Sequence, residues 1–387
     1  MLGINSQRAR HLENALDVYS KINTGNLPID TFLRCYFRAN KVSPGSRAWV
    51  AEHVYEVQRW KALLAHMSPK PVTWTGMLTT YLLHPRWRYM TGRKGLAPHL
   101  RCSFPEALFE RLERQYGQEK AFEICNILNE EPVTYLRVNT LKTSRDKAYK
   151  FLLHKGIAVE KCVESPCALL LTNKKQLLES SEYHKGLVEI QDLSSQLCGH
   201  KIDTQPGEHV LDYCAGSGGK ALVFGPKMAN KGRIYLHDVN DNLLVKAKRR
   251  LKRAGIRNYC ILDNNCSNMR RYYGMMDWVI ADVPCTGIGL LRRNPDRKWT
   301  FSSDLVNNYT SLQRTIVDNA LLFLKPGGRL AYITGSIFEE ENELQVSYMC
   351  KKHGLEPTQP STLQLPVSRG MNGYFISILQ RPEKTKV

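Results

Sequence analysis

Residues 209–220 read HVLDYCAGSGGK, an apolar run ending in Asp212 that leads through a glycine-rich turn directly into a helix. Glycines let the backbone approach a ligand closely, and a helix N-terminus offers free N–H groups and positive potential to an anionic group. Many nucleotide-binding folds, and some purely structural turns, contain such a segment. The stretch therefore predicts a strand, a turn and a helix, and the ligand has to be argued from the rest of the chain.

Apolar runs typical of strands recur after this turn and alternate with amphipathic helices. They read RIYLHD, YCIL, DWVIAD, RLAYIT and YFISILQR. Crossovers of helix length imply a parallel, doubly wound sheet. We therefore expect an α/β, Rossmann-type domain over residues 187–387, with its ligands at the carboxyl ends of the strands.

The first half of the chain has a different pattern. From Leu12 to Leu82 apolar residues recur at spacings of three and four, which predicts a helical domain over residues 1–90. Residues 84–105 lose that period and gain Pro, Gly and Arg, as expected of a basic linker. Residues 104–186 combine helical stretches with short strands such as TYLRVN, and we expect a small α+β unit of RRM-like type there.

The charge balance points to a polyanionic partner. Fifty-five Lys and Arg against 36 Asp and Glu leave a formal net charge of +19 over 387 residues, which favours nucleic acid over an anionic membrane surface. Charge that serves solubility alone is the alternative.

The 11 cysteines are scattered without ligand spacing, so we expect neither disulfides nor a metal. No leader or long apolar run is visible, which predicts a cytoplasmic protein outside the membrane.

Acidic residues end the second, third and fourth strands of the expected sheet. Asp238 comes 18 residues after Lys220, where a carboxylate can bind both ribose hydroxyls; a helix N-cap is the alternative role. The chain has neither GxGxxG nor a phosphate-binding GKS or GKT here, which argues against NAD and ATP. We infer S-adenosylmethionine as the cofactor. The candidate cofactor-binding residues are Cys214, Ala215, Gly216, Ser217, Gly218, Gly219, Lys220, Asp238, Asp263 and Asp282.

The fourth strand continues into a candidate catalytic pair, Asp282 and Cys285. One reaction that needs these two residue types is the methylation of cytosine at carbon 5. It requires a thiolate that adds to carbon 6 and an acid near N3, so a cysteine and a carboxylate must flank the base. A lone cysteine is more often a small buried apolar residue. Outside this motif, we would interpret Cys285 in that way.

Several motifs in order resemble the Sun/Fmu/Nop family of RNA 5-methylcytosine methyltransferases. They are Asp282-x-Pro-Cys-Thr-Gly-x-Gly with Arg292–Asp296, and also Arg137–Lys142, Gln191–Leu197, Lys325–Gly328, Glu340–Glu343 and Gly373–Phe375. The N-terminal GSRAWVAEHVYEVQRW resembles the NusB-like domain of the bacterial 16S ribosomal RNA members, which implies that the helical domain over residues 1–90 binds RNA. The resemblance implies a Rossmann-type S-adenosylmethionine-dependent enzyme that forms 5-methylcytosine in RNA, in ribosomal RNA first and tRNA second.

The chain departs from this family in two places. Gly216-Ser217 stands where the family usually has Ala-Pro, and Thr334-Gly335-Ser336 stands where the family has the Thr-Cys-Ser of its nucleophile. Three hypotheses stay open: a cytosine-5 enzyme that attacks with Cys285, an enzyme with a less demanding acceptor, and a catalytically silent RNA-binding assembly factor.

Basic residues lie near these motifs. Arg292 and Arg293, with Arg297 and Lys298, adjoin the expected catalytic rim, and we expect them to hold the phosphates of a flipped nucleotide. The helix after the second strand carries a further basic run from Lys246 to Arg253, which is either a solvated face or a phosphate contact. Oligomeric state is open.

Overall fold

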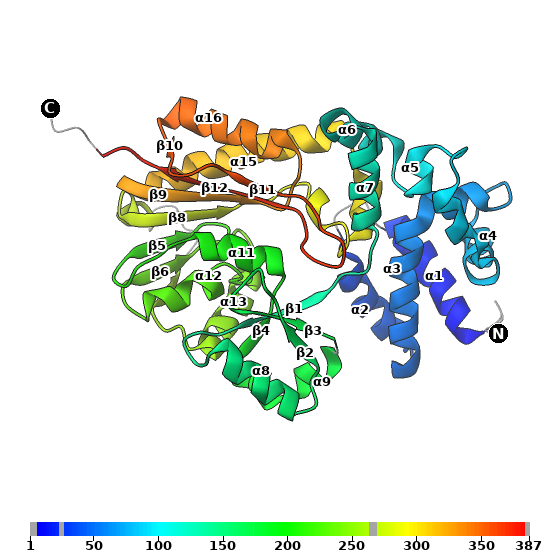
Figure 1. Ribbon diagram of the computed structural model, residues 1–387, viewed down its shortest axis with the longest axis horizontal. Coiled ribbons are helices and arrows are strands. Elements are labelled where there is room, and N and C mark those ends of the chain that lie inside the picture. Colours follow the sequence, from blue (N-terminus) through cyan, green and yellow to red (C-terminus); the bar gives the residue numbers. More distant parts are fainter. Residues whose placement is uncertain (1–5, 23–26, 173, 263–268, 384–387) are drawn as a thin grey trace. The chain divides into compact units, whose positions relative to one another are not determined.

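The computed structural model describes residues 6–22, 27–172, 174–262 and 269–383. The chain divides into two compact units, which are coloured along the sequence in Figure 1. The helical unit comprises Met1–Glu131 and Leu290–Leu305, and the sheet unit comprises Pro132–Gly289 and Val306–Val387. Among the residues that the structure describes, no helix has both the length and the hydropathy of a membrane span.

The helical unit begins with four helices: α1 (Gln7–Ile22), α2 (Ile29–Ala39), α3 (Pro44–Met67) and α4 (Trp74–Leu83). Proline at or just before the first helical position explains where α2 and α3 begin, because proline tolerates the helix start but not its interior. The side-chain oxygen of Thr73 accepts a hydrogen bond from the N–H of Gly76 and caps α4. The apolar residues that recur at spacings of three and four in the sequence pack into one shared core.

The predicted basic linker over residues 84–105 is wrong, because this segment is part of the helical unit. It forms the 3-10 helix η1 (Pro85–Gly92) and the short helix α5 (Pro98–Arg101). Trp87 is only 1% exposed, with its ring centroid 5.5 Å from that of Trp60 and 6.0 Å from that of Tyr81. Loss of the helical period showed that the segment is irregular, but not that it is unpacked.

The helical unit continues through α6 (Glu106–Tyr116) and α7 (Gln118–Leu128). It also takes in η5 (Pro295–Thr300), because residues 290–305 leave the sheet unit and return to it at Val306. Sequence order gave no indication of that excursion. The three-domain division therefore stays a prediction beside the two compact units of the structure.

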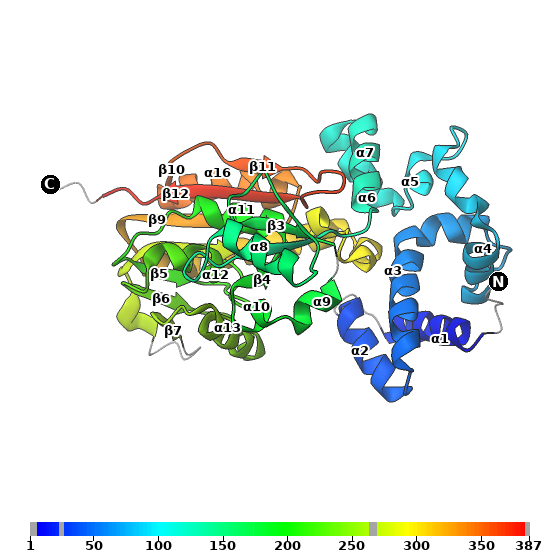
Figure 2. The same ribbon diagram turned by 60° about the horizontal axis from the view of Figure 1, so that its bottom comes forward.

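The sheet unit begins with a small antiparallel sheet in the order β2-β3-β1-β4, of which β3 and β4 are labelled in Figure 2. Its strands are β1 (Thr134–Val138), β2 (Val159–Lys161), β3 (Ala168–Leu171) and β4 (Val188–Ile190). The helices between them are α8 (Arg145–His154), α9 (Lys174–Glu179) and α10 (Ser181–His184). The Ser144 side chain caps α8 by accepting from the N–H of Lys147.

The main sheet has the order β10-β12-β9-β8-β5-β6-β7, with β11 paired to β12. Neighbouring strands from β5 to β9 pair in parallel, and β12 runs antiparallel to β9. The strands are β5 (His209–Asp212), β6 (Arg233–Leu236), β7 (Tyr259–Ile261), β8 (Met276–Asp282), β9 (Leu324–Thr334), β10 (Glu356–Pro357), β11 (Thr362–Gln364) and β12 (Tyr374–Gln380). The predicted α/β, Rossmann-type fold class is confirmed.

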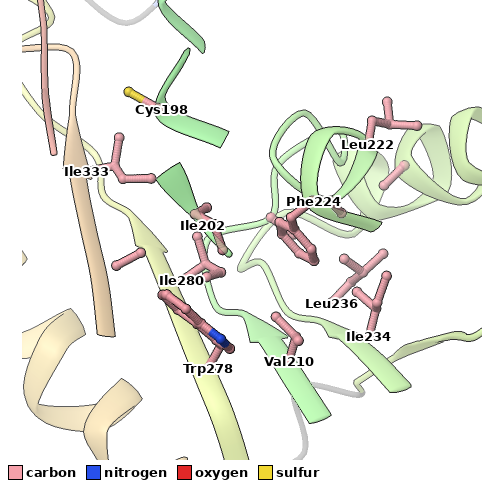
Figure 3. Close-up of a cluster of buried hydrophobic side chains, with 14 of the residues drawn as sticks. Cys198, Ile202, Val210, Leu222, Phe224, Ile234, Leu236, Trp278, Ile280 and Ile333 are labelled. Carbon is pink, nitrogen blue, oxygen red and sulfur yellow. The ribbon is translucent and has the colours of Figure 1, made fainter. Parts of the chain in front are cut away.

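Helices cover both faces of this sheet (Figure 1). On one face lie α11 (Leu193–Lys201), α12 (Ala221–Phe224) and α13 (Asp241–Ala254); on the other lie α15 (Ser303–Ala320) and α16 (Glu343–His353). Figure 3 shows the first of these cores, in which Phe224, Val210 and Trp278 meet between α12 and the sheet. Strand order reverses between β5 and β8, so the ligand crevice is expected beyond their carboxyl ends.

Candidate functional site

The glycine-rich turn between β5 and α12 has a left-handed backbone at two positions. Gly216 has φ of +51° and Gly218 has φ of +78°, a region that side chains disfavour. A Cβ on Gly218 would meet Cβ of Ala247 at 3.2 Å, whereas a Cβ on Gly216 would meet nothing within 4 Å. Gly218 therefore lets α13 pack closely, and Gly216 leaves the outer side of the turn open to a ligand.

Lys220 and Asp282 form an ion pair between the end of this turn and the end of β8. Lys220 Nζ lies 2.7 Å from Asp282 Oδ2 and also donates to Ser195 Oγ at 3.3 Å. The Lys220 side chain is 8% exposed and that of Asp282 is 36% exposed. Burial alone would lower the pKa of Lys220, but the Asp282 carboxylate outweighs burial and raises that pKa. The pair therefore holds a proton at a solvent-accessible rim.

Asp238 joins the end of β6 to the glycine-rich turn. Its Oδ2 accepts from the N–H of Gly216 at 2.8 Å, and its Oδ1 accepts from the N–H of Asn240 at 2.9 Å. The N-cap of α13 is Asn240, so the alternative role of Asp238 as that cap is excluded. Val239, next to it, is 90% exposed and provides an apolar surface that sequence reasoning missed. Asp263 lies outside the described residues.

Asp212 ends β5 beneath the turn and is 1% exposed. Both of its carboxylate oxygens are buried without a hydrogen-bond partner among the described residues. Burial, and then the charge of Asp282, raise the pKa of Asp212 to about 8. A buried carboxyl group without a donor is costly, so a cationic or N–H group of a ligand at this position would be favoured.

Two side chains that sequence reasoning did not assign to the cofactor site hold the glycine-rich turn. Arg250 Nη1 donates to the carbonyl oxygen of Ser217 at 2.8 Å and to its hydroxyl at 2.7 Å, and Arg250 Nε lies 3.3 Å from Oε1 of Glu189 on β4. Gln191 Nε2 donates to the carbonyl oxygen of Gly219 at 2.8 Å. The Gln191 motif was recognisable from the family resemblance, but the basic run of α13 concealed the role of Arg250.

Cys285 lies beside Gly335, the residue at the position of the family nucleophile. The N–H of Gly335, just after β9, donates to Cys285 Sγ at 3.3 Å. The Gly335 carbonyl oxygen accepts from the N–H of Gly289 at 3.0 Å, which fixes the two loops against each other. Cys285 is half-buried. Burial, and then the charge of Glu341, raise the pKa of its thiol to about 12.

A buried carboxylate organises these two loops from below. Glu341 is fully buried and its Oε1 accepts from the N–H of Thr286 at 2.9 Å and from Gln313 Nε2 at 3.0 Å. Its Oε2 accepts from the hydroxyls of Thr286 and Ser336, both at 2.5 Å. Because Thr286 follows Cys285 and Ser336 follows Gly335, Glu341 fixes the spacing of the thiol from strand β9.

The predicted RNA-contacting arginines belong to the helical unit. Arg292 is 1% exposed; its Nε donates to the carbonyl oxygen of Ile127 at 3.2 Å and its Nη2 lies 3.5 Å from Glu130 Oε2. The RNA contact predicted for Arg292 is therefore corrected to a structural role within that unit. Arg293 is half-buried, and its RNA contact stays a prediction. Lys298 is also 1% exposed, so it too is structural.

The basic face of α13 is divided between two roles. Lys246, Lys248, Arg249 and Lys252 are exposed. Arg250 and Arg253 turn inwards to Glu189, with Arg253 Nη2 at 2.5 Å from Glu189 Oε2. The two alternatives for this basic run, a solvated face or a contact with phosphates, therefore remain open only for the four exposed residues.

Two family profiles match the chain. The domain described as Methyltr_RsmF/B-like, ferredoxin-like domain matches residues 104–177, and the family described as 16S rRNA methyltransferase RsmB/F matches residues 200–379. Ribosomal RNA small subunit methyltransferase B of Escherichia coli O6:K15:H31 (strain 536 / UPEC) is 30% identical over 292 residues, which cover 73% of this chain and 67% of the relative. The chain belongs to the RsmB/F family.

A second RsmB/F relative agrees with this, and two solved structures show the same fold. Ribosomal RNA small subunit methyltransferase B of Photorhabdus laumondii is 29% identical over 287 residues, 72% of this chain and 66% of the relative. The chain thus spans about two thirds of the length of these relatives. The crystal structure of PH0851 covers 96% of this chain and 98% of its own at a TM-score of 0.76 and 23% identity. A methyltransferase homolog protein from Pyrococcus horikoshii covers 73% of this chain and 97% of its own at 0.65 and 26%.

The residues of the RsmB/F site fit S-adenosylmethionine. The unpartnered carboxyl group of Asp212 suits the amino group of the methionine part, and the open outer side of Gly216 leaves room for it. Asp238 is half-buried at the end of β6, and exposed Val239 beside it suits the flat face of an adenine. Donors, acceptors and an apolar contact therefore follow one another along the carboxyl edge of β5 and β6.

Proposed function

We propose that this chain transfers the methyl group of S-adenosylmethionine to carbon 5 of a cytosine in RNA, with ribosomal RNA as the substrate and Cys285 as the nucleophile. The observation that carries the proposal is the 3.3 Å hydrogen bond from the N–H of Gly335 to Cys285 Sγ. It means that the position where the family nucleophile is missing already has a thiol beside it. The relatives named above are methyltransferases by name, so the catalytically silent alternative has no support among them.

The cofactor, when bound, supplies an electrophilic methyl group. Asp212, Asp238 and the turn from Cys214 to Lys220 would hold it at the carboxyl edge of β5 and β6. Arg250 and Gln191 would keep the turn in shape, because both donate hydrogen bonds to its carbonyl oxygens. Cytoplasmic location and action on ribosomal rather than transfer RNA are parts of this proposal.

The acceptor chemistry falls to Cys285 and to the Lys220–Asp282 pair. The thiolate of Cys285 would add to carbon 6 of the base, and the electron pair of the carbon 5–carbon 6 double bond would move to carbon 5. Asp282, with the ammonium of Lys220 2.7 Å away, would present a proton and a carboxylate to the N3 side. Transfer of the methyl group to carbon 5 would break its bond to the cofactor sulfur and leave S-adenosylhomocysteine. Loss of the carbon 5 proton to water would then expel the thiolate from carbon 6 and restore the double bond.

The test is covalent trapping on RNA that contains 5-azacytidine. Wild-type protein with S-adenosylmethionine should form an adduct that mass spectrometry maps to Cys285; Cys285→Ser should form none, and the matched control Cys350→Ala should behave as wild type. Because the pKa of Cys285 is raised to about 12, the thiolate fraction, and with it the rate of trapping, should rise about tenfold per pH unit from neutral to mildly alkaline pH. Methyl transfer without an adduct at Cys285 would remove the nucleophile from the proposal. Cofactor binding without any methyl transfer would favour the silent binder.

A further inference from the structure

The helical unit displays a basic and aromatic surface on η1 and the loop after it. Five side chains within residues 85–95 are exposed: Arg86, Arg88, Tyr89, Arg93 and Lys94. Tyr89 is 81% exposed, an unusual position for a large aromatic side chain. We call these five residues the η1 surface.

The η1 surface is held in place by the residue at its centre. Trp87, between Arg86 and Arg88, is 1% exposed and packs into the core of the helical unit beside Trp60 and Tyr81. The guanidinium of Arg88 lies 5.1 Å from the centroid of the Trp87 ring. Because the anchor is buried, the flanking cations and Tyr89 are presented outwards by a fixed backbone, which reduces the entropy lost on binding.

The charge of this surface is not neutralised locally. From Val57 to Pro105 the sequence contains no Asp or Glu. Among the residues that the structure describes, no ion pair with a carboxylate involves Arg86, Arg88 or Lys94. Unpaired, exposed cations favour a polyanionic partner.

We propose that the η1 surface binds single-stranded RNA, with the cations on phosphates and a base stacked on Tyr89. An exposed aromatic ring among cations suits a strand whose bases are unstacked, since every base has a face that can stack and each phosphate is close to it. A membrane surface would use the charge but not the ring in this way. The proposal rests on the proposed function in taking RNA as the partner, and it assigns RNA binding by the helical unit to the five residues of the η1 surface.

Fluorescence anisotropy of a labelled single-stranded RNA of mixed sequence tests it, over a series of salt concentrations and without cofactor. Arg86→Ala/Arg88→Ala should reduce the slope of log affinity against log salt by about 1.4, because each neutralised phosphate of a single strand contributes about 0.7 to that slope. The matched control Arg10→Ala/Arg38→Ala, which removes two exposed arginines of the same unit, should leave the slope unchanged. Unaltered melting temperatures would show that each variant is folded.

Tyr89 separates stacking from charge. Tyr89→Ala should weaken RNA binding about tenfold, and Tyr89→Phe should bind as wild type. If both variants bind equally and vesicles containing phosphatidylserine compete as well as RNA, the surface is a general anion surface and the proposal is overturned. If wild type binds RNA and Arg86→Ala/Arg88→Ala has the same affinity and the same salt dependence, the η1 surface is refuted and the proposed function is not affected. If wild type binds no RNA at all, the proposed function falls with it.

Discussion

Lys220 and Lys298 are both buried lysines, one at the glycine-rich turn of the sheet unit and one in the core of the helical unit, but their surroundings differ. Lys220 lies 2.7 Å from the Asp282 carboxylate, which raises its pKa in spite of burial. Lys298 Nζ donates to the carbonyl oxygen of Arg59 at 2.6 Å and to Asn129 Oδ1 at 2.9 Å, which are neutral acceptors. Burial lowers its pKa to about 7. The partner thus decides whether burial leaves a lysine charged or lowers its pKa towards neutrality.

The largest effect is expected where the structural donor is removed. Lys298→Ala leaves a buried carbonyl and a buried amide oxygen without a donor, and it should lower the free energy of unfolding by about 3–5 kcal/mol. Lys298→Met, which keeps the volume, should cost less. Urea denaturation measures both, and Arg297→Ala, at the exposed neighbouring position, is the control. A destabilisation no larger than that of Arg297→Ala would contradict the structural role.

The same lysine should make stability depend on pH with a definite sign. Its pKa in the folded chain is lowered to about 7, whereas an unfolded lysine keeps its proton up to about pH 10.4. Between these values the unfolded state binds more protons, so this group's contribution to stability rises with pH across the window and is lost as pH falls towards 7. Lys298→Met should abolish that part of the rise, and an unchanged pH profile would argue against it.

Lys220→Met should change the stability of the protein little and lower its methyl-transfer activity strongly. Asp282 is 36% exposed, so water can solvate its carboxylate when the lysine is gone, and the free energy of unfolding should change by no more than about 1 kcal/mol. Methyl transfer should fall at least about a hundredfold, because the proton held at the rim is lost. Single-turnover methylation and urea denaturation on the same sample give both numbers. If Lys220→Met destabilises the protein as much as Lys298→Ala does, both lysines have a structural role and the contrast between them is contradicted.

The sequence predicted the parts that follow from local periodicity and motif order. The strands HVLDYC and DWVIAD became β5 and β8 with Asp212 and Asp282 at their carboxyl ends, because alternation of strand and helix fixes a parallel sheet. It did not predict that Arg292 and Lys298 would be buried, since the sequence around a charged residue does not show whether distant residues of its own unit cover it. Residues 290–305 join the helical unit because they pack against residues 1–131. Contacts between segments so far apart in the chain leave no trace in the local spacing of apolar residues.

The smallest effect is expected at Arg250, which tests whether α13 shapes the glycine-rich turn or only presents a solvated basic face. It makes two hydrogen bonds to Ser217 with one guanidinium and remains paired to Glu189. Arg250→Lys keeps the charge but cannot reproduce this geometry, so the dissociation constant for S-adenosylmethionine should rise about tenfold, measured by calorimetry. Arg249→Lys, at an exposed position one residue away, should leave it unchanged. Equal effects of the two variants would mean that α13 acts through charge alone and that Arg250 does not shape the glycine-rich turn.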